Sequence, residues 1–366
     1  MKFIHAADIH LGCQPDRGFP WSRERSFDIL AAFRDLIDAC RTERADLLLL
    51  SGDIFHRQPA PAELKEAEAL FSNIPQIPIV MISGNHDPVR PGSALAEYAW
   101  PSHVSFLSSR ELSSVSFPDL KTVVHGFSYH TREIREPLYD SLTAPGDGNF
   151  HILLAHGGDA SHIPIDREKL ARSGFSYIAL GHIHKPELDP DHRLAFAGSL
   201  SPIDLTETGS HGYIVGELEE NGESGDLALR FVPLPSRSYI PCAVKVTPRT
   251  THQSLYQTVK KFIEQHGVSN IYRLTLTGQR DPDITFDQTY LSDAGRIISY
   301  KDETVPAYDL PALYRDHRRD IIGAFIDAFS KGEAGHSEND SVRSQAFYYG
   351  LDALLSNFDS DTGESQ

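Results

Sequence analysis

The stretch that decides the fold is IPIVMISGNHD, residues 77–87. Its first six residues are apolar, and a short apolar run of this kind is typical of a buried strand. The run ends in Gly84-Asn85-His86-Asp87, where amide, imidazole and carboxylate side chains follow one another directly. In α/β proteins the ligand site lies just beyond the carboxyl ends of the strands. This stretch therefore predicts an α/β fold with a polar site at the end of the strand.

The same arrangement recurs at four other places in the chain. Apolar runs at 2–7, 47–50, 151–155 and 177–180 read as strands and precede, in that order, Asp8-x-His10, Gly52-Asp53, His156 and Gly181-His182-Ile183-His184. Each piece alone is weak, because Gly-Asp often marks a turn and a lone histidine is usually an ordinary polar residue. All five in this order, each after an apolar run, predict that side chains from position 8 to position 184 meet in one cleft.

The remaining elements divide the chain into a large α/β part and a smaller appendage. Apolar periodicity predicts helices over residues 23–40, with Phe27, Leu30, Phe33 and Ile37 on one stripe, and over 61–71. Further strands are expected at 104–107, 121–126, 194–197 and 212–218. Prolines within residues 233–237 mark a boundary.

Beyond that boundary the pattern predicts a small β-α-β unit and two helices. The unit comprises a strand at 243–246, a helix at 254–266 and a strand at 271–276. One amphipathic helix is expected at 310–329, with Leu313, His317, Ile321, Phe325 and Phe329 on one stripe, and a second at 342–358. A polar linker is expected at 331–340 and a disordered tail at 359–366. The expected domains are 1–237, 238–300 and 301–366.

Composition sets broad limits on function. The chain has 366 residues, 40% of them hydrophobic, and no apolar run long enough to span a bilayer. The lack of such a run predicts no membrane association, and three cysteines without metal-type spacing predict a reducing cytoplasm. A net charge of −17 disfavours nucleic-acid binding through a generally basic surface. A metal site could still supply local positive potential.

The residue types of the five pieces suit a pair of divalent cations. A carboxylate can bridge two ions, which together can activate water and stabilise charge on a phosphoester. Mixed imidazole, amide and carboxylate ligands suit Mn²⁺, with Fe²⁺ and Zn²⁺ as alternatives. Asp8 and Asp53 are the only anions among the seven candidate ligands, so two dications would leave the site net positive.

These motifs resemble the calcineurin-like metallophosphoesterase superfamily, whose pattern is D-x-H, GD, GNH[DE], H and GH-x-H. The resemblance covers residues 1–202 and implies a four-layer α-β-β-α sandwich, here with a small α+β cap and C-terminal helices. It assigns Asp8, His10 and His184 to one metal. It assigns Asn85, His156 and His182 to the other, with Asp53 bridging.

The resemblance also implies three residues that act without binding metal. His86 would contact the substrate phosphate or protonate the leaving oxygen, and Asp87 would orient its ring. His56, three residues after the bridging ligand, would contact substrate. Arg17, Arg23, Arg25 and Arg57 lie near the motif loops and are candidates for phosphate contacts.

Local features are similar to the SbcD-type and YhaO-type DNA repair exonucleases. Residues 6–12 match the "AD-x-HLG" opening of that group, and residues 52–56 match its "GD-hydrophobic-F" motif. In this group the C-terminal helices dock a coiled-coil SMC-like ATPase, and a homodimer is a further candidate assembly. One departure is that Gly157-Gly158-Asp159 follows His156, where relatives often carry a Gln or Asn-like residue.

The leading hypothesis is a Mn²⁺-dependent DNA exo/endonuclease in DNA repair, in which a metal-activated hydroxide attacks the backbone phosphate. A small-molecule phosphodiesterase or protein phosphatase using the same site is the alternative. A scaffold without enzymatic activity is a third hypothesis, which the non-ligand His86 disfavours.

Overall fold

The computed structural model describes residues 1–220, 226–330 and 339–361. The chain divides into two compact units, Met1–Tyr239 and Ile240–Gln366. None of the helices within the described ranges is long and apolar enough to cross a membrane.

The first unit contains two six-stranded sheets. In the first sheet the order is β12-β11-β1-β2-β3-β4, and in the second it is β5-β6-β7-β8-β10-β9. The first sheet comprises β1 (Lys2–Ala6), β2 (Leu47–Ser51), β3 (Ile79–Ile82), β4 (Val104–Phe106), β11 (Gly212–Glu219) and β12 (Asp226–Pro233). The second comprises β5 (Ser113–Phe117), β6 (Thr122–Gly126), β7 (Phe150–His156), β8 (Tyr177–Gly181), β9 (Glu187–Asp189) and β10 (Leu194–Phe196).

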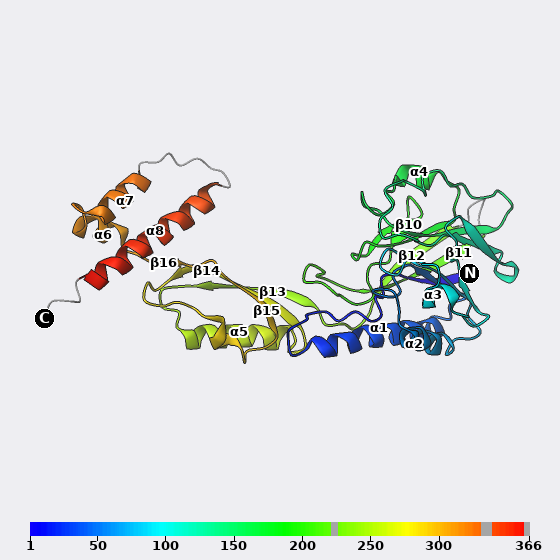
Figure 1. Ribbon diagram of the computed structural model, residues 1–366, viewed down its shortest axis with the longest axis horizontal. Helices are drawn as coiled ribbons and strands as arrows, with labels where there is room; N and C mark the ends of the chain where they lie inside the picture. The colour runs from blue at the N-terminus through cyan, green and yellow to red at the C-terminus, as the bar shows by residue number, and fades with distance from the viewer. Residues whose placement is uncertain (221–225, 331–338, 362–366) are drawn as a thin grey trace. The chain divides into compact units, whose positions relative to one another are not determined.

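Alternation of apolar side chains along the strands builds the layers. In β2, Leu47 and Leu49 pack between the two sheets, whereas Leu48 and Leu50 face the opposite way. The outward residues pack against α1 (Ser22–Thr42) and α2 (Pro61–Phe71). These two helices lie on one side of the strands and α4 (Arg167–Ala171) lies on the other (Figure 1).

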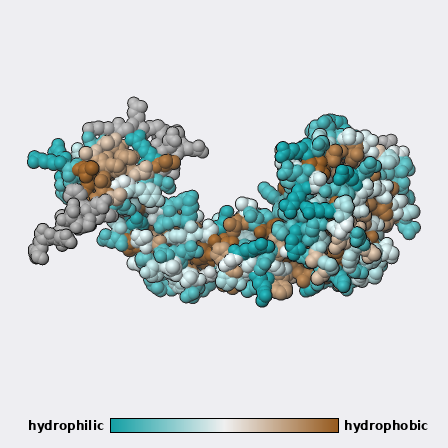
Figure 2. All heavy atoms as spheres, viewed as in Figure 1, coloured by the Kyte–Doolittle hydropathy of each residue, from teal (hydrophilic) through white to brown (hydrophobic). Residues whose placement is uncertain are grey.

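The two-sheet α/β class is therefore confirmed, with a thin fourth layer. The outer face of the second sheet is covered by five-residue α4 and by aromatic side chains from loops, including Tyr129 and Tyr139. Hydrophilic residues cover much of the visible surface of this unit, with hydrophobic residues in separate patches (Figure 2).

Strand direction decides where the site lies. Strands β1 to β4 run parallel to one another, and so do β6, β7, β8 and β10. The carboxyl ends of β1, β2 and β3 thus lie at one edge of the first sheet, and those of β7 and β8 at one edge of the second. The five motif segments follow these five strands.

The second unit begins with a small sheet and a helix. It contains β13 (Tyr239–Val246), α5 (His252–His266), β14 (Ile271–Arg280), β15 (Ile297–Asp302) and β16 (Val305–Pro306). Helix α5 packs its buried residues Leu255, Val259 and Ile263 against the sheet. This is the predicted β-α-β unit, extended by β15 and β16. These two strands were not predicted, because their apolar runs are short.

The helix expected at 310–329 is two helices, α6 (Leu310–Asp316) and α7 (Ile321–Ser330). The carboxylate of Asp320 accepts hydrogen bonds from the backbone N–H groups of Ile322 and Gly323, which starts a new helix. Because the helix restarts there, Ile322 and Ile326 are buried and Ile321 is 62% exposed. The predicted stripe through Ile321 is wrong for this reason.

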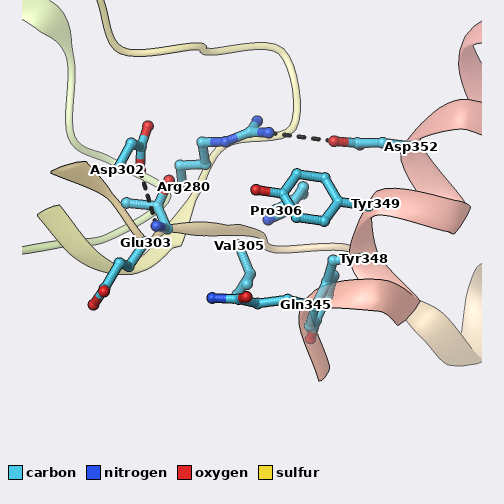
Figure 3. A pocket seen from close by; sticks show the side chains of 10 residues that line it. Arg280, Asp302, Glu303, Val305, Pro306, Gln345, Tyr348, Tyr349 and Asp352 are labelled. Atoms are coloured by element: carbon cyan, nitrogen blue, oxygen red, sulfur yellow. Dashed lines mark hydrogen bonds and ion pairs between the residues drawn. The ribbon is translucent and has the colours of Figure 1, made fainter. Parts of the chain in front are cut away.

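Helix α8 (Asn339–Asp361) is longer than predicted at both ends. The start of the expected tail, 359–361, is helical, while residues 331–338 and 362–366 lie outside the described residues. Asp352 on α8 pairs with Arg280 at the end of β14, beside a pocket lined by Val305, Tyr348 and Tyr349 (Figure 3).

Candidate metal centre

Three motif glycines allow the loops after β2, β3 and β8 to approach one another. A Cβ on Gly84 would lie 2.3 Å from Oδ1 of Asp53, and one on Gly181 would lie 2.1 Å from the carbonyl oxygen of Ser51. Gly52 has φ +88°, and its Cβ would meet Nδ1 of His156 at 2.5 Å. No larger residue fits at these points, which explains why glycine precedes three of the candidate ligand segments.

The backbone at the site is strained. Asp8, His10 and Asp53 have φ near 50°, and His182 has φ 90°. Non-glycine residues adopt such values at a cost of about 1–3 kcal/mol each, and they cluster at functional sites. Four of the seven candidate ligands are therefore held in conformations that the surrounding structure must enforce.

One half of the site is formed by Asp8, His10 and His184. Nε2 of His10 lies 3.0 Å from Nε2 of His184, and Oδ1 of Asp8 lies 4.0 Å from the same His184 nitrogen. One donor atom from each of the three residues lies within 4.8 Å of the others. Atoms that carry lone pairs converge here, which is the arrangement a cation requires.

The other half is formed by Asn85, His156 and His182. Oδ1 of Asn85 lies 2.9 Å from Nε2 of His156 and 3.1 Å from Nδ1 of His182. The opposite ring nitrogen of His156, Nδ1, donates to the carbonyl of Ser51 at 2.8 Å. The Ser51 carbonyl thus keeps a proton on Nδ1, so Nε2 is the nitrogen that can lose its proton and bind a cation.

Asp53 lies between the two halves. Its Oδ2 is 4.0 Å from Nε2 of His10 and 3.4 Å from Nε2 of His156, while its Oδ1 accepts the backbone N–H of His86 at 2.8 Å. The side chain is 1% exposed. Its position fits the bridging role that the resemblance implies.

The carboxylates create a strongly negative potential in this buried pocket. Burial lowers the pKa of His156, but Asp53 and Asp8 outweigh it and raise the pKa to about 9. Burial likewise opposes Glu207 and Asp8 at His184, whose pKa is also raised to about 9. The potential that holds protons on these rings would also stabilise divalent cations, whose binding would release the protons.

His86 and His56 lie beside the first half of the site without belonging to either ligand set. Nδ1 of His86 donates to the carbonyl of His56 at 3.0 Å, and the two rings stack with centroids 5.2 Å apart. The His86 ring also meets that of His10 edge-on at 4.8 Å. With its Nδ1 proton fixed by a carbonyl, Nε2 is the His86 atom available to a substrate.

The role predicted for Asp87 is wrong. Its two oxygens accept the backbone N–H groups of Phe55 at 3.0 Å and Gly84 at 2.7 Å, so it ties together the loops after β2 and β3. The group that orients the His86 ring is the carbonyl of His56. Sequence adjacency had suggested the carboxylate, but the turn directs it into the loop backbone.

Two carboxylates that the sequence did not single out contact candidate ligands. Oδ2 of Asp159 lies 2.7 Å from Nε2 of His182, and Oε1 of Glu207 lies 2.7 Å from Nδ1 of His184. Asp159 lies on a loop 23 residues before His182, and Glu207 lies on a different loop 23 residues after His184. The unusual Gly-Gly-Asp after His156 was the one sequence signal that pointed to either.

Two sheets whose strand ends bring together carboxylate, amide and imidazole donors define a metallophosphoesterase. A model of the calcineurin-like phosphoesterase family matches residues 1–186, and the chain belongs to that family. Members of the family typically bind two divalent metals. The resemblance seen in the sequence is thereby confirmed.

Two curated relatives and one solved structure give the nearer context. The chain is 30% identical over 304 residues to the uncharacterized metallophosphoesterase YhaO of Bacillus subtilis, covering 76% of this chain and 72% of that one. It is 28% identical over 265 residues to the DNA double-strand break repair protein Mre11 of Methanocaldococcus jannaschii, covering 67% and 70%. A dimetal phosphatase from Danio rerio aligns with 63% of this chain and 98% of its own, at 14% identity and a TM-score of 0.39.

Proposed function

We propose that this phosphoesterase is a Mn²⁺-dependent nuclease that cuts phosphodiester bonds in DNA, as an exo/endonuclease in DNA repair. The observation that carries the proposal is the pairing of two ligand sets across Asp53 with His86 beside them. Support for DNA as the substrate comes from the relatives named DNA double-strand break repair protein Mre11.

The proposed ligands are Asp8, His10, Asp53 and His184 for one ion and Asp53, Asn85, His156 and His182 for the other. Mn²⁺, Fe²⁺ and Zn²⁺ all suit this donor set. Two such ions, when bound, would supply an activated water and stabilise charge on the phosphate oxygens. The chain itself contributes the rest of the chemistry.

His86 is the proposed proton donor to the departing sugar oxygen. The carbonyl of His56 holds its Nδ1 proton, so Nε2 can exchange a proton with the substrate. The ring of His56 stacks on that of His86 and is half-buried, so it can contact the same phosphate. Asp87 acts by fixing the loop that carries both Asn85 and His86.

The candidate phosphate contacts narrow to two arginines. Arg25 is buried, donating to Asp28 at 2.8 Å and to the carbonyl of Pro202, and Arg57 is paired with Glu63 at 2.8 Å. Arg17 and Arg23 are exposed. The charges of Arg17 and Arg57 both contribute, after burial and His86, to lowering the pKa of His56, so both guanidinium groups lie near the proposed substrate site. Arg17 is the one of the two that is not paired with Glu63.

The C-terminal helices are the proposed docking site for a coiled-coil ATPase partner. Among the side chains of α6, α7 and α8 that the structure describes, Ile322, Ile326 and Leu351 are the buried members of a shared apolar cluster. A groove of about 320 Å³ lies among Leu310, Phe329, Arg343 and Phe347. Hydrophobic residues also gather on the visible side of these helices (Figure 2).

The test is hydrolysis by the purified protein with Mn²⁺. End-labelled single- and double-stranded DNA and bis-p-nitrophenyl phosphate are offered in parallel, with and without EDTA. We expect EDTA-sensitive cleavage of all three. Hydrolysis of the small diester with both DNAs intact, even with an ATPase partner added, would reject the nuclease in favour of a small-molecule phosphodiesterase.

A further inference from the structure

The outermost histidine of each proposed ligand set is held by a carboxylate. Nε2–H of His182 donates to Asp159, and Nδ1–H of His184 donates to Glu207, each at 2.7 Å. A carboxylate that accepts the proton of one ring nitrogen fixes the tautomer and makes the other nitrogen a better ligand. The two acceptors therefore select opposite tautomers for two histidines that are two residues apart.

The selected nitrogens point in the directions that the two ligand sets need. With Nε2 protonated, His182 presents the lone pair of Nδ1, which lies 3.1 Å from Oδ1 of Asn85. With Nδ1 protonated, His184 presents the lone pair of Nε2, which lies 3.0 Å from Nε2 of His10. In the opposite tautomers the protonated nitrogens would face the proposed cations, and neither ring could bind its ion.

Asp159 is placed by a loop that only glycine can form. Gly157 and Gly158 have φ of +149° and +128°, and a Cβ on Gly157 would lie 2.5 Å from the carbonyl oxygen of His162. Oδ1 of Asp159 then accepts the backbone N–H of Ser161 at 2.7 Å, and its carboxylate also lies 2.9 Å from Nδ1 of His162. The Gly-Gly-Asp sequence is thus explained by the contact it allows between the carboxylate of Asp159 and Nε2 of His182.

Glu207 is placed by the loop that follows β10. Its Oε2 accepts hydrogen bonds from the hydroxyl of Ser199 at 2.9 Å and from the backbone N–H of Ile203 at 3.1 Å. This leaves Oε1 for His184. The side chain is 9% exposed, so its position is set by the folded loop and not by solvent.

We propose that Asp159 and Glu207 are a matched pair of positioning residues, each of which sets the affinity for a different one of the two ions. The proposal rests on the proposed two-metal site and does not depend on the substrate. Loss of such a partner typically lowers metal affinity about 10- to 100-fold. Asp159→Asn should weaken only the ion held by Asn85, His156 and His182, and Glu207→Gln only the ion held by Asp8, His10 and His184.

The experiment measures Mn²⁺ binding, not activity. Metal-free protein is titrated with Mn²⁺ by calorimetry, and low-temperature EPR distinguishes a coupled ion pair from single ions. Wild type should bind two ions as a coupled pair. Each single variant should keep one affinity and lose about 10- to 100-fold in the other, so that an isolated-ion signal appears at intermediate Mn²⁺.

Asp147→Asn is the matched control. Asp147 also bonds a histidine, His151, at 3.0 Å and is 49% exposed, close to the 46% of Asp159. It precedes β7, whereas the site lies beyond the other end of that strand. This variant should bind two ions with wild-type affinity. Circular dichroism and thermal unfolding check that every variant is folded.

Double variants assign each carboxylate to its ion. Asp159→Asn combined with Glu207→Gln should weaken the binding of both ions. The total loss of Mn²⁺ affinity should be the product of the losses in the two single variants, because the two residues act independently. In a His182→Ala background, Asp159→Asn should cause little further loss of Mn²⁺ affinity, since both substitutions act through one ring. In a His184→Ala background, it should cause its full loss of affinity.

Several outcomes would overturn the proposal. If wild type and both variants bind two ions with equal affinity, the proposed role of the two carboxylates is refuted, whereas the two-metal site stands. A third ion in wild type that Asp159→Asn removes would make Asp159, His162 and His182 a metal site instead. Fewer than two ions in wild type would refute the two-metal site and this proposal together. None of these results depends on whether DNA is cleaved.

Discussion

The two outer histidines of the site have equally short carboxylate contacts but differently built surroundings. Glu207 is nearly buried and anchored by Ser199 and Ile203, whereas Asp159 is 46% exposed and shares its carboxylate with His162. A buried hydrogen bond in low dielectric is stronger and less screened than an exposed one. Equal distances therefore do not mean equal control over the metals.

The same comparison changes the charge expected at the site. With only Asp8 and Asp53 counted, two dications would leave a net positive centre. The structure adds Asp159 and Glu207, whose carboxylates contact the outer nitrogens of His182 and His184. These two further negative charges lie one imidazole ring beyond the proposed ions and reduce the positive charge that two dications would give the site. In a protein of net charge −17, nearby arginines and open coordination positions on the proposed ions would then contribute more to the attraction of a phosphate.

Removing the residue that the two halves share should have the largest effect. Asp53→Asn takes away the proposed bridge and should lower Mn²⁺ occupancy at both positions, with hydrolysis of bis-p-nitrophenyl phosphate reduced by about 10³-fold or more. Elemental analysis after dialysis gives the occupancy. Two fully retained ions would show that Asp53 does not bridge.

Removing His86 should lower turnover without changing metal binding at either ligand set. His86→Ala should keep two ions and lose about 10²- to 10⁴-fold in kcat, the range for a proton-transfer group. His192→Ala is the control, because His192 is a half-buried histidine whose partners, Asp189 and Glu168, are not among the proposed site residues. If His86→Ala turns over within a few-fold of wild type, His86 has no part in the reaction.

Salt should separate the two carboxylates. The loss of Mn²⁺ affinity caused by Asp159→Asn should shrink a few-fold between about 0.05 and 0.5 M KCl, since exposed charges are screened over the ~10 Å Debye length at 0.1 M. The loss caused by Glu207→Gln should stay constant. Identical salt dependence in the two variants would remove the distinction between a buried and an exposed acceptor.

His5 provides a histidine with no carboxylate partner and should give the smallest effect. Nδ1 bonds the hydroxyl of Tyr177 and Nε2 that of Ser51, and burial lowers the pKa of His5 to about 3. The unfolded chain therefore takes up a proton below about pH 6.5 that the folded protein excludes, so stability is lost as pH falls from 6.5 toward 3.

The measurement is the free energy of unfolding of wild type and His5→Gln by denaturant titration across this window. We expect a shallower fall with acidification in His5→Gln, because glutamine takes up no proton. Parallel pH profiles would show that His5 is not the residue excluding the proton.

Much of the fold was predictable because the spacing of apolar residues along the chain indicates which segments form strands and which form helices. The run at 61–71 gave α2 with its observed bounds, and each motif strand lies within two residues of its predicted position. The edge strands β5 and β9 were missed because they are short and half-polar. Phe27 was placed on the buried stripe of α1 but is 64% exposed, since Ile29 and Leu36 take the buried positions.

The five motif segments could be identified from the sequence, because each places polar side chains directly after an apolar run. Three of them add the glycine that the close approach of the loops requires. The acceptors that hold His182, His184 and His86 follow from how the loops fold and could not be found in the sequence. Asp159, Glu207 and the carbonyl of His56 reach those rings through loop geometry, and hydrogen bonds across a fold leave no fixed spacing along the chain. Asp87 shows the converse, because the carboxylate adjacent to His86 in sequence is directed by its turn to the backbone.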